Sequence, residues 1–106
     1  MALEGFWYAI NMDRIEDDWI IYYYYFDNLI KIEDREYVIA IRVETNMGEC
    51  SEPELAWDHN LDNKQRAINQ VPDSVEKVVL NMLSDPFLEI DCLKYITTIH
   101  NTFKEN

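Results

Sequence analysis

The run DWIIYYYYFD at positions 18–27 constrains the fold more than any other part of the sequence. Aromatic rings crowd the preceding turn of a helix, whereas β-branched and aromatic side chains suit the pleated surface of a sheet. We therefore predict a strand here. Its alternate side chains point to opposite faces, so Trp19, Tyr23 and Tyr25 share one face. The other face ends in Phe26 and is typical of a core, so we expect the first set to point outward.

Other segments of the N-terminal half also favour strands. The segment YVIAIRVET alternates, with Arg42 and Glu44 on the face opposite to Tyr37. The predicted strands cover residues 5–12, 19–26, 29–32 and 37–45. The turn-prone pair Asp27-Asn28 allows the third of these segments to return beside the second. The simplest arrangement is an antiparallel β-meander of three or four strands.

The C-terminal half contains start and stop signals that are typical of helices. SEPE at 51–54 matches a capping box and predicts a helix start. A shorter, weaker helix is predicted over 63–69. The clearest helix is DSVEKVVLNMLS at 73–84, with Asp73 as its cap. Its apolar residues follow the spacing i, i+3, i+4, i+7, i+8, namely Val75, Val78, Val79, Met82 and Leu83.

The pair Asp85-Pro86 ends that helix and opens another over 87–103. Its wide apolar stripe consists of Phe87, Ile90, Leu93, Ile96, Ile99 and Phe103. The prediction is a single α+β domain over residues 1–106. In it, an N-terminal antiparallel β-meander of three to four strands is covered on one face by two to three C-terminal helices.

The charge of the chain limits its partners. Asp and Glu number 21 against 9 Lys and Arg, which gives a formal net charge of −12. Phosphate backbones and anionic membrane surfaces repel such a chain, so we expect neither direct nucleic-acid binding nor membrane binding. The N-terminus has no basic leader, and Cys50 and Cys92 lack CxxC spacing, so a cytoplasmic protein with reduced thiols is expected. The acids can serve solubility alone, or they can attract a basic protein partner.

Two stretches are candidate binding surfaces. The stretch from Glu44 to Asp62 holds six acids and no Lys or Arg. Its candidate partner-binding residues are Glu49, Glu52, Glu54, Trp57, Asp58 and Asp62. The tyrosine run adds Trp19, Tyr23 and Tyr25. The simpler interpretations are a solvated acidic surface and a ledge of rings that shields the sheet. As binding surfaces, the acids would speed association with a basic partner, and the aromatic rings would supply contact area.

No catalytic, metal or cofactor motif is visible. His59 lies near Asp58 and Asp62, but no second His or Cys occurs at ligand spacing. Neither cysteine has basic neighbours that would lower the pKa of a nucleophilic thiol. The two glycines, at 5 and 48, do not form a phosphate-binding loop. We therefore expect a binding protein without cofactor or metal, and not an enzyme.

In size, acidity, aromatic content and lack of catalytic apparatus, the whole chain resembles bacterial toxin-immunity proteins, including those of contact-dependent growth inhibition. The resemblance implies tight binding of a cognate toxin domain, often a nuclease, with the acidic stretch at or near its nucleic-acid cleft. One alternative is a phage-encoded inhibitor that imitates nucleic acid, of the anti-restriction or anti-CRISPR kind. Another is a structural domain that self-associates through the tyrosine face.

Overall fold

The computed structural model describes residues 5–13, 18–27, 29–46, 49–58, 67–68 and 70–104. In this part of the chain seven strands form one sheet, and two helices follow. The strands are β1 (Gly5–Asp13), β2 (Asp18–Phe26), β3 (Ile30–Ile32), β4 (Arg35–Asn46), β5 (Glu49–Cys50), β6 (Glu54–Asp58) and β7 (Ala67–Ile68). The helices are α1 (Asp73–Leu83) and α2 (Leu88–Lys104).

Strand β4 holds the sheet together. It pairs antiparallel with β2 and β3, and also with β5 and β6, while β1 joins through β2 and β7 through β1. Because β4 is surrounded by neighbours, its alternating Ile39, Ile41 and Val43 expose at most 1% of their surface. The predicted return of 29–32 beside 19–26 is wrong: Ile30 lies opposite Tyr37, so β3 pairs with β4.

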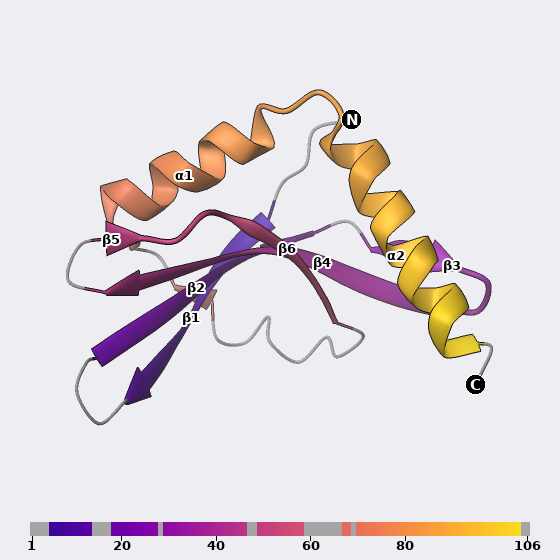
Figure 1. Cartoon of the computed structure of the whole chain (residues 1–106), viewed down its shortest axis with the longest axis horizontal. Helices are drawn as coiled ribbons and strands as arrows, with labels where there is room; N and C mark the ends of the chain where they lie inside the picture. Colours follow the sequence, from indigo (N-terminus) through magenta and orange to yellow (C-terminus); the bar gives the residue numbers. More distant parts are fainter. Residues whose placement is uncertain are drawn as a thin grey trace.

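Both helices pack on one face of this sheet (Figure 1). Val75 and Val79 of α1, with Ile96 of α2, are buried against the branched residues of β4. The helix-side cluster also includes Tyr22 and Phe26 of β2. The predicted α+β fold, a meander covered on one face by helices, is therefore confirmed.

The opposite face of the sheet is more enclosed than the sequence predicts. Tyr25 lies on this face, away from the helices, but only 6% of its surface is exposed, so its expected outward exposure is wrong. The reason is packing among rings: Tyr25 stacks on Phe6 at 5.5 Å and on Tyr23 at 5.6 Å between ring centroids. Tyr8 is buried with it, and Tyr23 is half-buried. The side chain of Trp19 lies outside the described part of the structure.

The predicted helix start at 51–54 is wrong. Residues 51–53 are irregular and lead into strand β6. The hydroxyl of Ser51 accepts a hydrogen bond from the N–H of Glu44 at 2.9 Å, and the Ser51 N–H donates to the Glu44 carbonyl at 2.8 Å. Ser51 thus connects two strands instead of capping a helix. Within the predicted 63–69 helix, residues 67–68 form strand β7, and the rest of that segment lies outside the described residues.

The two C-terminal helices lie close to where they were predicted, with two differences. Pro72, not Asp73, occupies the N-cap position of α1, and Asp73 lies in the first turn. In α2 the buried residues are Leu88, Cys92, Ile96 and His100, spaced by four. Of the predicted stripe, Ile96 is buried, whereas Phe87, Ile90, Leu93 and Phe103 are exposed. The predicted stripe is wrong because it omits Leu88, Cys92 and His100, three of the four buried residues of α2.

The buried His100 links the end of α2 to the sheet through its two ring nitrogens. Its Nδ1 lies 2.5 Å from the Tyr37 hydroxyl, and its Nε2 lies 3.3 Å from a carboxylate oxygen of Glu33. Glu33 is also ion-paired with Lys104 in the last turn of α2. Glu33 turns the chain between β3 and β4 with φ of 55°, a left-handed conformation that is unfavourable for a residue with a side chain. These contacts hold the turn against α2.

The Glu33 contacts predict a pH dependence of stability. The hydrogen bond from Lys104, and next that from His100, lowers the pKa of Glu33 below its ordinary 4.5. A carboxylate with a lower pKa in the folded state stabilises the fold above its unfolded pKa, and this contribution is lost as pH falls through the folded value. Glu33→Gln should therefore unfold at lower urea concentration than the parent at pH 7. The difference should shrink as pH falls below about 4.5; a constant difference from pH 7 to pH 3 would contradict the assignment.

A second prediction concerns Gly5, where β1 and β2 approach closely. A Cβ at this position would overlap the backbone carbonyl of Tyr25 in the neighbouring strand, which cannot yield as a flexible side chain can. Gly5→Ala should destabilise the protein by about 1–3 kcal/mol, a typical cost of overpacking. Urea unfolding followed by tryptophan fluorescence measures the loss, and an unchanged midpoint would refute the close contact.

Candidate functional site

A row of side chains crosses four strands on the face away from the helices. Tyr8 lies opposite Tyr23, Tyr23 opposite Arg42, and Arg42 opposite Glu54 in the registers of β1, β2, β4 and β6. Residues directly opposite in an antiparallel pair present their side chains on the same face. This cross-strand row therefore runs from two tyrosine rings, through one cation, to an exposed acid.

Arg42 joins the tyrosine rings to the acidic stretch. Its guanidinium is 2.5 Å from a carboxylate oxygen of Glu44 and 3.9 Å from one of Glu54. Burial favours a lower pKa for Arg42, but hydrogen bonding with Tyr23 and Glu44 outweighs it and raises the pKa above its ordinary value. The guanidinium stays charged and neutralises part of the local negative charge. The sequence analysis did not select Arg42, although the strand pattern placed it on the same face as Glu44.

Three of the predicted acids line the border of the sheet. Glu49 of β5, Glu52 of the irregular segment 51–53 and Glu54 of β6 are exposed, and we call them the acidic edge. Both strands pair with β4 on one side, and no other described strand pairs with them. Charged side chains on such an edge discourage pairing with the strand of another chain. The same charges lie where a cationic partner can reach them.

The other predicted residues lie elsewhere or outside the described side chains. Trp57 points toward the helices, because it lies opposite Ile39 of the helix-side cluster. Its ring packs against Tyr37 at 5.8 Å and Phe103 at 5.7 Å between centroids. Trp57 is therefore on the opposite face from Glu54. Asp58 ends β6, but its side chain, like the whole of Asp62, lies outside the described structure.

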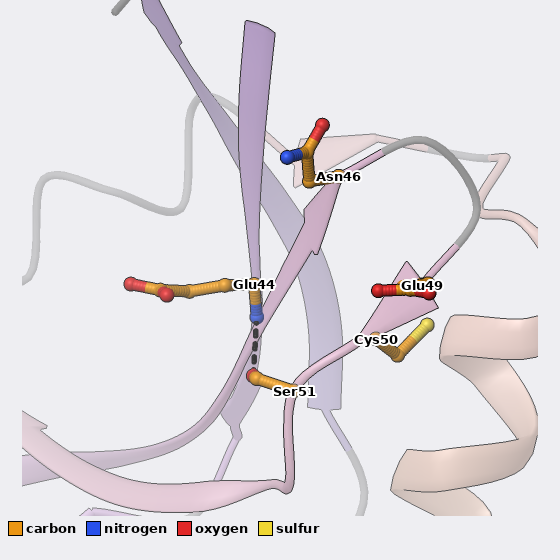
Figure 2. A pocket seen from close by; sticks show the side chains of 5 residues that line it. All are labelled: Glu44, Asn46, Glu49, Cys50 and Ser51. Carbon is orange, nitrogen blue, oxygen red and sulfur yellow. Dashed lines mark hydrogen bonds between the residues drawn. The ribbon is translucent and has the colours of Figure 1, made fainter. Parts of the chain in front are cut away.

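A small open pocket of about 240 Å³ lies at the end of the β4–β5 hairpin. Its lining residues are Glu44, Asn46, Glu49, Cys50 and Ser51. Figure 2 shows the Glu44 side chain directed away from Glu49 and Cys50, with Ser51 hydrogen-bonded to the Glu44 backbone. The Glu44 carboxylate instead contacts Arg42. Within the described residues, no group of three His, Cys, Asp or Glu side chains could hold a metal ion.

The thiols differ in their surroundings. Cys92 is buried in the helix-side cluster, and this burial, with nearby Asp91 and Glu89, raises the pKa of its thiol to about 11. Cys92 is consequently protonated at neutral pH and is a packing residue, since the thiolate is the nucleophilic form. Cys50 is half-buried at the pocket and packs against the same cluster.

Comparison with known proteins identifies no relative: no family model, curated protein or solved structure matches this chain. Neither described helix is long and apolar enough to cross a membrane.

Arg42 should contribute measurably to stability through its contacts with Glu44, Glu54 and Tyr23. Replacing it with glutamine leaves two carboxylates without their cation, and we expect Arg42→Gln to cost about 1 kcal/mol, the upper range for partly exposed ion pairs. Lys31→Gln, which removes the exposed cation of strand β3, serves as the control. Equal urea midpoints for the two variants would contradict the role of Arg42.

Proposed function

We propose that the chain is a non-enzymatic binding protein that neutralises a basic protein partner, as toxin-immunity proteins do. The observation that carries the proposal is the acidic edge, with Glu49, Glu52 and Glu54 all exposed on neighbouring segments. A toxin domain that binds nucleic acid offers a cationic cleft, and such a cleft is the natural complement of this edge.

The surroundings of the acidic edge also support binding. The Glu54 side chain is 72% exposed, while its neighbour Arg42 is held by Glu44 at 2.5 Å. The cation thus pairs closely with the inner Glu44 and only at 3.9 Å with Glu54, whose exposed side chain can still contact a partner. Clustered charge of one sign accelerates association, and the half-buried Tyr23 beside Arg42 adds an aromatic contact.

The first test is capture of the partner from a lysate of the cells that make the protein, with washes at low and then high salt. We expect one basic protein to be retained at both salt concentrations. A partner lost at high salt and displaced by DNA or RNA would instead indicate nucleic-acid mimicry. Absence of any partner, together with self-association in solution, would favour a structural domain.

Charge reversal then tests the surface. The double variant Glu49→Lys, Glu52→Lys should slow association with the captured partner by at least about tenfold at low salt, because electrostatic steering acts on the association rate. The control is Asp27→Lys, Glu36→Lys, which changes the net charge equally at exposed acids outside the acidic edge. Equal rates for the two double variants would exclude the acidic edge as the contact surface.

A further inference from the structure

Large apolar side chains lie on the solvent-exposed side of α2 and of the turn before it, where polar residues are usual. Ile90 and Leu93 of α2 are 65% and 50% exposed. Phe87, in the turn just before the helix, is 63% exposed, and its carbonyl accepts a hydrogen bond from the Asp91 N–H. We call these three residues the outer stripe. They lie three residues apart, whereas the core contacts of this helix come from Leu88 and its partners spaced by four. Positions three apart follow one another along the same side of a helix. The first turns of α2 therefore carry large apolar side chains both toward the sheet and away from it, with charged residues between them.

Exposed apolar residues scattered singly are ordinary, but a row of three large ones on a helix marks a contact surface. The protein's own core does not require these residues, because Leu88, Cys92 and Ile96 already fill the space between α2 and the sheet. Six residues of rise at 1.5 Å give the outer stripe a length of about 9 Å, which suits about two turns of another helix.

The charges around the outer stripe indicate the charge of the partner that would bind there. The segment 85–93 carries three acids and no Lys or Arg, and two of these acids, Asp85 and Asp91, are exposed. The first basic residue, Lys94, is exposed one turn after Ile90 and borders the stripe, so the surroundings hold three acids and one lysine and remain net negative. A second copy of this chain, with a net charge of −12, would bring the same acids together around the contact. A helix that combines apolar and basic side chains would bury the stripe and pair with the acids.

We propose that the outer stripe of α2 docks an amphipathic helix with a basic flank, supplied by another protein. This surface lies on a different element from the acidic edge, so the inference does not depend on the function proposed above. Together, the two surfaces would let one basic partner contact the sheet edge and the helix layer.

The test uses a synthetic helical peptide about 18 residues long, with leucine on one face and lysine on the other, and a matched peptide with glutamate in place of lysine. Fluorescence anisotropy measures binding to the full-length protein. We expect the lysine peptide to bind at least about tenfold more tightly than the glutamate peptide. We also expect Ile90→Gln, Leu93→Gln to weaken it at least about tenfold, which corresponds to about 1.4 kcal/mol. Because both residues are exposed, the variant should keep the parent's unfolding midpoint.

Two control variants locate the binding. Tyr95→Gln removes an exposed ring that lies five residues and about 140° around the helix from Ile90. Glu49→Lys, Glu52→Lys alters only the acidic edge. Both should bind the lysine peptide as the parent does. The proposal is overturned if the Ile90→Gln, Leu93→Gln variant (the stripe variant) binds the lysine peptide as tightly as the parent does. It is also overturned if Glu49→Lys, Glu52→Lys abolishes binding, or if the parent binds the glutamate peptide as tightly as the lysine peptide. A dimer in sedimentation equilibrium that the stripe variant dissociates would also overturn it, because a second copy would then be the occupant.

Discussion

The pairing of β4 with neighbours on both sides is the constraint on which the rest of the structure depends. One set of its side chains, Ile39, Ile41 and Val43, is buried beneath both helices. The other set includes Ala40 beneath the tyrosine rings and Arg42 between Tyr23 and Glu54. A shift of one residue in the register would exchange these two sets, placing a guanidinium in the apolar layer and isoleucines on the opposite face. The core and the candidate surface are thus fixed by the same strand.

The sequence predicted the fold where one periodicity dominated. The tyrosine run, the alternation of β4 and the valine pattern of α1 each allowed one structure, and all three were correct. The capping-box match at Ser51 failed because its hydroxyl hydrogen-bonds to Glu44 of a neighbouring strand, a contact distant in sequence. The face of α2 was misassigned for a similar reason. The contacts of His100 with Tyr37 and Glu33 make it a core residue, and no local pattern reveals contacts more than sixty positions apart.

The candidate site could be predicted only in part. The acids Glu49, Glu52 and Glu54 are exposed as a run of like charge suggests, because few partners could neutralise them in a core. Trp57 and Tyr25 were less predictable, since an aromatic ring in a strand is equally suited to a core and to an interface. Pairing decided between these alternatives: Trp57 lies opposite Ile39 on the helix side, and Tyr25 packs between Phe6 and Tyr23. The link through Arg42 appears only when three strands are aligned.

Native-state amide hydrogen exchange of the free protein tests most directly whether β4 holds the two faces in place. The backbone amides of residues 39–43 that are protected by the sheet should exchange only through global unfolding, with a free energy equal to that from urea denaturation. Amides near the ends of α2 and in the short strand β5 should exchange at lower free energies. If residues 39–43 instead exchange through local opening while the helices stay protected, the sheet would not be the element that positions the acidic edge and the cross-strand row.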